Sequence, residues 1–285
     1  MAQQPVTAAL IKELRERTGV GMGKCKEALE GAKGDIDVAI SDLRKAGLAS
    51  AVKKEGRATN EGMIGVADTV KAIGLVEVNS ETDFVARNER FQQFVAELAA
   101  AVANDNIANA EELAAHSISK DGQKHTVDQF RAELVQTIGE NIQVRRVKTF
   151  PKKSDKSIGV YSHLGGKIVT LVEIGGADGE EALAKDIAMH VAAASPDYLS
   201  PEEIPADMIA KEREIAESQV MGKPANIVEK IVDGKLNSFY DSSCLARQKF
   251  IKDDSLTIAE LVAQRAKTTG KPLKLVAFTR WNLGQ

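Results

Sequence analysis

The chain of 285 residues has little of what a metal centre or a disulfide framework requires. It contains two cysteines, Cys25 and Cys244, which lie far apart and form no CxxC pair, and its four histidines are scattered. Zinc sites and disulfide frameworks use such residues at short, regular spacings. We therefore expect no metal and no cofactor in this chain.

Aromatic residues and an excess of charge are also scarce. The 38 Lys and Arg residues nearly balance the 41 Asp and Glu residues, the net charge is −3, and 4% of the residues are aromatic. A surface that binds nucleic acid needs excess cations or exposed rings for base stacking. The composition therefore gives no support for direct contact with nucleic acid, and we expect none.

Long hydrophobic runs are missing as well. No stretch approaches the roughly 20 apolar residues of a membrane span, and the polar segment Met1–Leu14 does not have the pattern of a signal peptide. The expectation is a cytoplasmic protein without membrane contact. What the chain does have is 43% hydrophobic residues, enough to fill the cores of about two domains.

Residues 1–54 predict a module of three short helices. Apolar residues at helical spacing precede Gly19, Gly31 and Gly47. The next stretch, Ala51–Asn60, is polar and basic without an apolar period, which predicts a linker. The glycine-rich Gly19–Lys24 lacks the spacing of a phosphate-binding loop and is interpreted as a turn between helices.

An internal repeat dominates the middle of the chain. Ile64–Val66 is followed by Leu75–Val78, and Ile158–Val160 is followed by Leu171–Ile174, each pair preceding a helix with one apolar face. Each copy reads as strand, turn, strand and helix. The repeat predicts an α+β fold with duplicated core subdomains, an N-subdomain at 55–150 and a C-subdomain at 151–198 and 246–285.

Residues 199–245 predict an inserted helical hairpin. Ser200–Glu203 has the pattern of a capping box with proline at the first helical position, and Gly222 and Pro224 separate the two helices. The second helix carries an apolar stripe from Ile227 to Phe239 that a thin hairpin cannot bury alone. We expect this stripe to meet a partner or a second copy of the chain, and the second case would give a homodimer.

Candidate acids, bases and nucleophiles do not form a recognisable catalytic set. His163 lies in the turn of the second repeat and His190 on the helix that follows, and no nucleophile elbow or HExxH motif is present. We therefore expect no catalytic residues. His190 is interpreted as a core histidine, whereas His163 is open to solvent or to a partner.

The two repeats differ where the second strand leads into the helix. The first copy has Asn79–Asn88 there, whereas the second has the glycine-rich Gly175–Gly179. Phe84 either covers the core beneath it or protrudes as a wedge into an apolar crevice of a partner, with Asp83 as an acceptor at the rim. Spacing alone leaves both interpretations open.

Five ordered motifs resemble the bacterial elongation factor Ts family, the nucleotide exchange factors of the GTPase elongation factor Tu. They are Leu14–Gly19 with Cys25-Lys26, Thr82–Val85, Ile138–Ile142, Ile187–Val191 and Gly222–Pro224. The resemblance implies an N-terminal module like a ubiquitin-associated domain, a two-part core and a helical dimerisation insertion.

The resemblance also implies a function in translation elongation. Such a protein binds elongation factor Tu carrying GDP, dislodges its magnesium ion and promotes GDP release so that GTP can bind. The segment of Thr82, Asp83, Phe84 and Val85 matches the part that dislodges magnesium. The other matching contact positions are Lys26, Ile138, Gly139, His163 and Ile251, and Lys252 replaces a second apolar residue of some members.

Two further interpretations remain open. A non-catalytic protein-binding scaffold would use the N-terminal module and the hairpin, and it would associate with a partner without changing nucleotide release. An α+β hydrolase with an unrecognised site would turn over a small substrate without any GTPase.

Overall fold

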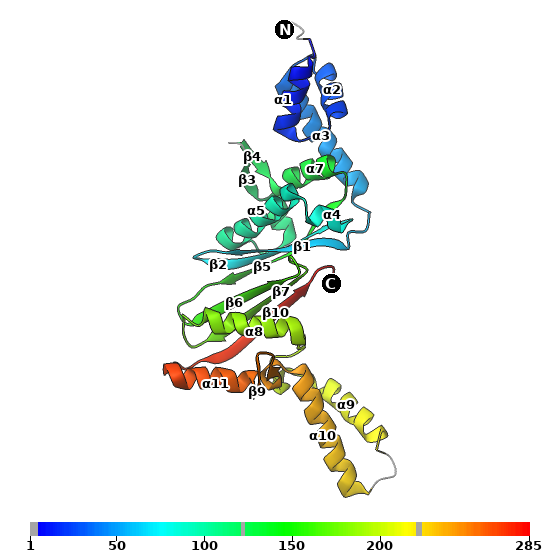
Figure 1. The fold of residues 1–285 in the computed structure, drawn as a ribbon. Coiled ribbons are helices and arrows are strands. Elements are labelled where there is room, and N and C mark those ends of the chain that lie inside the picture. Colours follow the sequence, from blue (N-terminus) through cyan, green and yellow to red (C-terminus); the bar gives the residue numbers. More distant parts are fainter. Residues whose placement is uncertain (1–4, 121–122, 221–223) are drawn as a thin grey trace. The chain divides into compact units, whose positions relative to one another are not determined.

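The computed structural model describes residues 5–120, 123–220 and 224–285 and has the predicted α+β class (Figure 1). The chain forms two compact units, Met1–Pro151 with Leu283–Gln285 and Lys152–Asn282. Each unit has its own three-stranded sheet and its own hydrophobic core. Among the described ranges, no helix combines the length and the apolar content of a membrane span.

Three helices begin the first unit, α1 (Ala8–Thr18), α2 (Met22–Gly31) and α3 (Ile36–Lys54). Gly19 ends α1 in the left-handed conformation, with φ 71°, and Gly21 caps the start of α2. The turn predicted at Gly19–Lys24 is therefore confirmed for Gly19–Gly21, whereas Met22–Lys24 already belongs to α2. The helices enclose a small core that contains Leu14, Val20, Cys25, Leu29, Ala32, Ala39 and Leu43.

The predicted linker is wrong at its beginning, because α3 continues to Lys54. The end of α3 packs on α7 (Val127–Ile138), and Ala51 is buried in the core of the first unit. Gly47 permits this approach, since an added Cβ would lie 3.0 Å from the Gln136 side chain. The buried contact holds a polar, basic segment in helical form.

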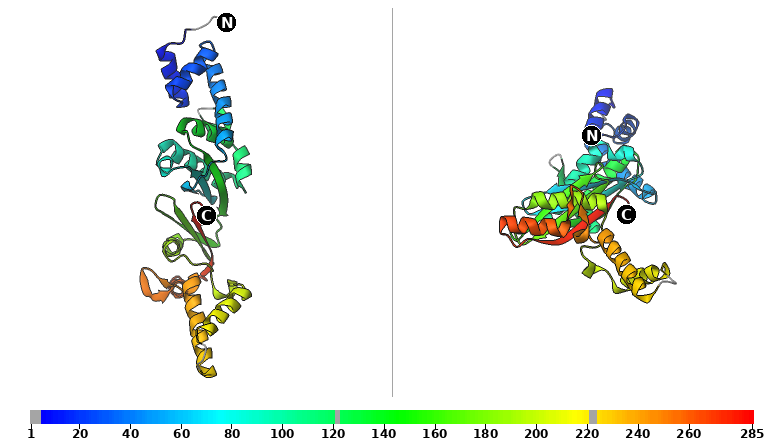
Figure 2. Two further views of the ribbon diagram at one scale, coloured as in Figure 1. Left: turned by 90° about the vertical axis from the view of Figure 1, so that its right-hand side faces the viewer. Right: turned by 60° about the horizontal axis from the view of Figure 1, so that its bottom comes forward.

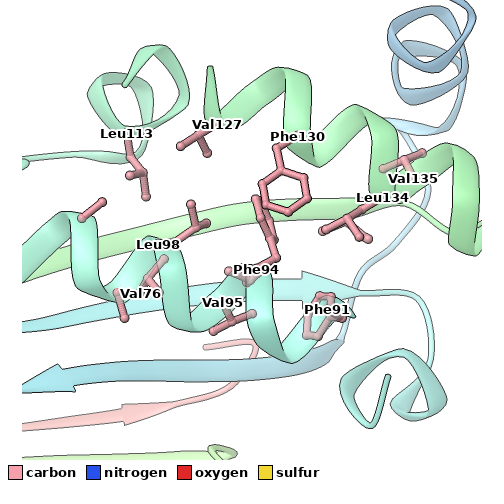
Figure 3. Packing of buried hydrophobic residues seen from close by; sticks show 14 of the residues in the cluster. Val76, Phe91, Phe94, Val95, Leu98, Leu113, Val127, Phe130, Leu134 and Val135 are labelled. Atoms are coloured by element: carbon pink, nitrogen blue, oxygen red, sulfur yellow. The ribbon is translucent and has the colours of Figure 1, made fainter. Parts of the chain in front are cut away.

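The sheet of the first unit has the antiparallel order β1 (Glu61–Asp68), β2 (Ala72–Ser80) and β5 (Ile142–Pro151). Helices α5 (Glu89–Asp105) and α7 supply much of its core (Figure 3). Phe94 of α5 meets Phe130 of α7 edge to face, with ring centroids 5.0 Å apart. In the sequence, α5 and α7 are separated by α6 (Ala110–Ala115) and by the paired strands β3 (Ser117–Lys120) and β4 (Gln123–Thr126). The sequence patterns did not indicate these elements.

The sheet of the second unit has the antiparallel order β10 (Lys274–Asn282), β7 (Ile168–Gly175) and β6 (Lys156–His163). Helices α8 (Glu181–Ala194) and α11 (Ile258–Thr269) contribute to its core. The short strands β8 (Lys249–Phe250) and β9 (Asp253–Thr257) precede α11. After β10 the chain returns to the first unit, where the Gly284 amide donates to the carboxylate of Glu77 at 2.8 Å.

The two copies of the sequence repeat share a succession of two strands and a long helix, β1–β2–α5 and β6–β7–α8, and the first copy has the short α4 (Asp83–Ala86) before α5. A glycine in the first strand of each copy lies directly under the helix. An added Cβ would lie 2.4 Å from Val95 Cγ1 at Gly65, and 2.0 Å from the backbone nitrogen of Lys185 at Gly159. Because glycine has no side chain, each helix can lie close against its strand.

The hairpin consists of α9 (Ala206–Ser218) and α10 (Ala225–Ser243), which pack side by side (Figure 1, Figure 2). The predicted capping box at Ser200 is wrong: Pro201–Glu203 forms a 3-10 turn, and the Ser200 side chain caps nothing. The helix begins only after Pro205. Pro205 has the fixed backbone angle that suits a helix start. The capping pattern at Ser200 placed the start too early in the sequence. Gly222, predicted to separate the helices, lies outside the described residues.

Much of the apolar stripe of α10 is buried inside the hairpin. Val232 and Leu236 pack with Ala216 and Val220, whereas Ile227 remains 45% exposed. The apolar surface left for a partner is smaller than predicted from the sequence, because α9 covers a large part of the stripe. The homodimer stays a prediction.

Candidate functional site

The segment Thr82–Val85 lies where β2 ends, with Thr82 preceding the short helix α4 (Asp83–Ala86). Val85 points into the core and is only 4% exposed, whereas Phe84 is 76% exposed. Within one helical turn, Val85 thus anchors the segment in the core and Phe84 protrudes from the surface. The interpretation that Phe84 covers the core is wrong, and the protruding ring is the geometry that a wedge requires.

Asp83 flanks the exposed ring and is itself partly exposed. Its Oδ2 accepts a hydrogen bond from Arg87 Nη2 at 3.0 Å, one helical turn further on. The pairing orients the carboxylate beside Phe84 and leaves it open to solvent. An acceptor next to an aromatic ring suits a contact in which the ring enters a pocket and the carboxylate meets a donor at the rim.

The turn between α7 and β5 lies beside this segment. Ile138 ends α7 and contacts the core, and Gly139 caps the helix in the left-handed conformation with φ 94°. Strand pairing sets Ser80 opposite Ile142. The structure therefore brings Thr82–Val85 and Ile138–Gly139, both predicted from the resemblance, to one end of the sheet.

Two glutamates connect these segments. Glu140 accepts from the Thr82 amide at 2.9 Å and from the Thr82 hydroxyl at 2.7 Å, and Glu81 accepts from the Asn141 amide at 2.6 Å. Neither glutamate was predicted from the sequence to have a role. About 60 residues separate the partners along the chain, so no local spacing pattern could have indicated the contact.

The remaining predicted contact residues lie elsewhere. Lys26 is on α2 among the first three helices, where it pairs with Glu30 at 3.7 Å. His163 and Ile251 belong to the second unit. His163 is exposed at the end of β6, with its Nδ1 3.1 Å from the Tyr161 hydroxyl, and Ile251 is exposed in the turn after β8.

Buried His190 supports the turn that carries Ile251. Its Nδ1 accepts from the Ile251 amide at 3.3 Å, and its Nε2 lies 2.9 Å from Gln248 Oε1. Because Nδ1 accepts, Nε2 must donate, and the imidazole is neutral. Burial lowers the pKa of His190, and its interpretation as a core histidine is confirmed. The adjacent Lys252 forms an ion pair with Asp186 at 2.8 Å.

The arrangement suits binding by surface complementarity. In the described part of the chain, no three His, Cys, Asp or Glu side chains are grouped so that they could hold a metal ion. Both cysteines are buried free thiols, and burial raises the pKa of each. What the Thr82–Val85 segment and the neighbouring turn offer is an exposed ring, a carboxylate and a firmly held backbone.

Comparison with known proteins gives one consistent result. The family model described as Elongation factor TS matches residues 81–285. Elongation factor Ts of Protochlamydia amoebophila (strain UWE25) is 63% identical over 280 residues, covering 98% of this chain and 99% of that protein. Elongation factor Ts of Chlamydia muridarum (strain MoPn / Nigg) is 47% identical over 274 residues, covering 96% and 97%. The similarity thus extends over nearly the whole length of the chains compared.

Proposed function

The chain belongs to the elongation factor Ts family and is a translation elongation factor, and we propose that it acts as a guanine-nucleotide exchange factor for the GTPase elongation factor Tu. In this role it is not itself an enzyme. It binds the GTPase carrying GDP, displaces the magnesium ion and promotes release of GDP, after which GTP binds.

The single observation that carries the proposal is the exposure of Phe84 next to the buried Val85. A large aromatic side chain on the surface gains little in folding and much in binding, and such rings are typical binding hot spots. Phe84 enters an apolar crevice near the magnesium and phosphate site of the GTPase, and Asp83 accepts a hydrogen bond at its rim. Thr82 and Val85 hold this wedge.

The energetics need no covalent step. A factor that binds the nucleotide-free GTPase more tightly than the loaded one must weaken nucleotide binding by the same ratio. Each tenfold of that ratio corresponds to about 1.4 kcal/mol of binding free energy. Part of the interface energy thus weakens nucleotide binding, and the wedge at the magnesium site lowers the barrier to GDP release. Incoming GTP reverses the coupling.

Further contacts distribute the interface along the chain. Ile138 and Gly139 extend the surface around Phe84, Lys26 contributes from the N-terminal helices, and His163 and Ile251 contribute from the second unit. Residues 1–54, which include Lys26, form a module like a ubiquitin-associated domain. The hairpin of α9 and α10 serves dimerisation. These contacts provide the affinity, and the wedge provides the displacement of magnesium.

The test is stopped-flow release of fluorescent GDP from elongation factor Tu into excess unlabelled GDP while this chain is titrated. A release rate that rises and saturates supports exchange through a ternary complex. A flat rate with folded protein and active GTPase contradicts it, and binding without faster release would favour the scaffold. Phe84→Ala should lower the maximal rate by about tenfold or more. The matched control is Val70→Ala, which removes an apolar side chain that is 93% exposed and should change nothing.

A further inference from the structure

We propose that Glu140 and Glu81 are positioning residues, which join the Thr82–Val85 segment and the Ile138–Gly139 turn into one preformed surface. This inference rests on the proposed function, because it assigns the two glutamates a role in presenting Phe84 to the GTPase. Neither glutamate needs to touch the partner. Each acts through the backbone of the segment opposite.

The fold places the two segments at the same end of the sheet. Strand β2 ends at Ser80, directly opposite Ile142 at the start of β5. The chain leaving β2 toward α4 therefore runs beside the chain entering β5 from α7. Beyond the last paired residues the ladder of backbone hydrogen bonds stops, so only side chains can hold the segments together.

Glu81 and Glu140 do this reciprocally. Glu81, on the β2 side, accepts from the Asn141 amide at 2.6 Å. Glu140, on the β5 side, accepts from the Thr82 amide through Oε2 at 2.9 Å and from the Thr82 hydroxyl through Oε1 at 2.7 Å. Hydrogen bonds to a carboxylate are among the strongest in proteins. We call this set of three hydrogen bonds the carboxylate clamp.

The Thr82 side chain bonds to Glu140 and does not cap its own helix. It occupies the N-cap position of α4, where a threonine side chain ordinarily accepts a hydrogen bond from the first turn. Here the Thr82 side chain makes no capping hydrogen bond, and its hydroxyl donates to Glu140 instead. The orientation of Thr82 thus favours the link to the neighbouring turn over the local stability of α4.

Asn141, whose backbone amide belongs to the clamp, is itself held in place by further hydrogen bonds. The fully buried Asn141 donates through its side-chain amide to the carbonyls of Glu55 at 3.2 Å and Arg57 at 3.0 Å. Arg57 in turn lies 3.4 Å from the Glu81 carboxylate. The residues that follow α3 are therefore tied to the same point. A wedge segment that is already held in its working conformation needs no further ordering at the step that displaces magnesium.

The first test is Glu140→Gln in the GDP-release assay. Glutamine keeps the shape, but its single amide oxygen cannot accept on both sides as a carboxylate does, so the Thr82 backbone loosens. We expect the maximal release rate to fall by about tenfold, because one hydrogen bond to a charged group is lost. The half-saturating concentration should change much less. Glu111→Gln, the same charge change at an exposed site on α6, is the control. An unchanged maximal rate in Glu140→Gln would overturn the proposal.

A double variant separates positioning from a general structural effect. If Glu140 acts through the wedge, Glu140→Gln should slow release little further once Phe84→Ala is present, because there is no ring left to position. Independent contributions would multiply instead. Multiplication of the two effects would therefore contradict the inference.

Amide hydrogen exchange of the free protein tests the carboxylate clamp without any GTPase. The Thr82 amide should be protected in the wild type and exchange about tenfold faster or more in Glu140→Gln, with the amides of α5 unchanged. Equal protection in both proteins would overturn the clamp itself. If hydrogen exchange changes as expected but the wild-type chain does not accelerate GDP release from the GTPase, the proposed function is wrong. The role of the clamp in exchange is then wrong as well.

Discussion

Glu77 Oε2 accepts a hydrogen bond from Arg146 Nε at 2.7 Å, and this carboxylate is entirely buried in the central strand of its sheet. Its Oε1 accepts from the Asn79 side chain at 3.2 Å. The second unit has a related pair, in which Glu173 of its central strand binds Lys156. Each copy of the repeat thus places a carboxylate on its central strand and neutralises it from a neighbouring strand.

Arg146→Ala should lower the free energy of unfolding by about 3 kcal/mol, because it removes the cation from a buried carboxylate. The adjacent Arg145 is exposed, and Arg145→Ala should change stability by less than about 0.5 kcal/mol. Urea denaturation followed by circular dichroism compares the two. Equal effects would mean that the buried pair contributes no more than a surface arginine.

Two glycine substitutions should have opposite effects. Gly159→Ala places a Cβ 2.0 Å from the Lys185 nitrogen, so α8 must move off β6, and we expect a loss of more than about 3 kcal/mol. Gly234 lies within α10 with nothing close to an added Cβ. Gly234→Ala should therefore stabilise the protein by about 0.5–1 kcal/mol. Melting temperatures that shift in the same direction would contradict the packing argument.

His190 should make stability depend on pH. Burial lowers its pKa in the folded state, so between that value and about 6.5 the unfolded chain binds more protons than the folded chain. Its contribution is therefore fully present above about pH 6.5 and is lost as the pH falls toward the folded-state pKa. The slope approaches about 1.4 kcal/mol per pH unit.

Denaturation between pH 5.5 and 7.5 measures this slope. His190→Gln should flatten it, whereas His163→Gln, which changes an exposed histidine of the same unit, should leave it in place. An unaltered slope in His190→Gln would exclude this histidine as its source.

Phe84 and Val85 should separate function from stability. Val85→Ala removes two methyl groups from the core and should cost about 2 kcal/mol of unfolding free energy. Phe84→Ala changes a side chain that is 76% exposed and should alter stability by less than about 0.5 kcal/mol. Thermal melts of the two variants check this. A large loss in Phe84→Ala would mean that the ring supports the fold.

The sequence could predict the parts of the fold that depend on local patterns. The repeat around Ile64 and Ile158 indicated both hairpins with their helices, and Gly19 indicated a turn. The helical path of residues 51–54 was not predictable in this way, because a basic segment of low periodicity is held by the burial of Ala51 against elements far along the chain.

The site was predictable to a similar extent. The family motifs pointed to Phe84 and Ile138, but the exposure of Phe84 depends on Val85 reaching the core, which spacing could not decide. Glu81 and Glu140 meet their partners across about 60 residues. Contacts between distant backbone groups leave no period in the sequence, so only the folded chain reveals them.

The hydrogen bond from Gly284 to Glu77 spans 207 residues of sequence, and this has a consequence for biosynthesis. Strands β1, β2 and β5 are all made before residue 152, so the first unit can begin to fold early on the ribosome. The Glu77 carboxylate nevertheless lacks one donor until residue 284 has been synthesised, after the whole second unit. The first unit is therefore the earlier to start folding, and it completes its hydrogen bonds only after the second unit has been translated.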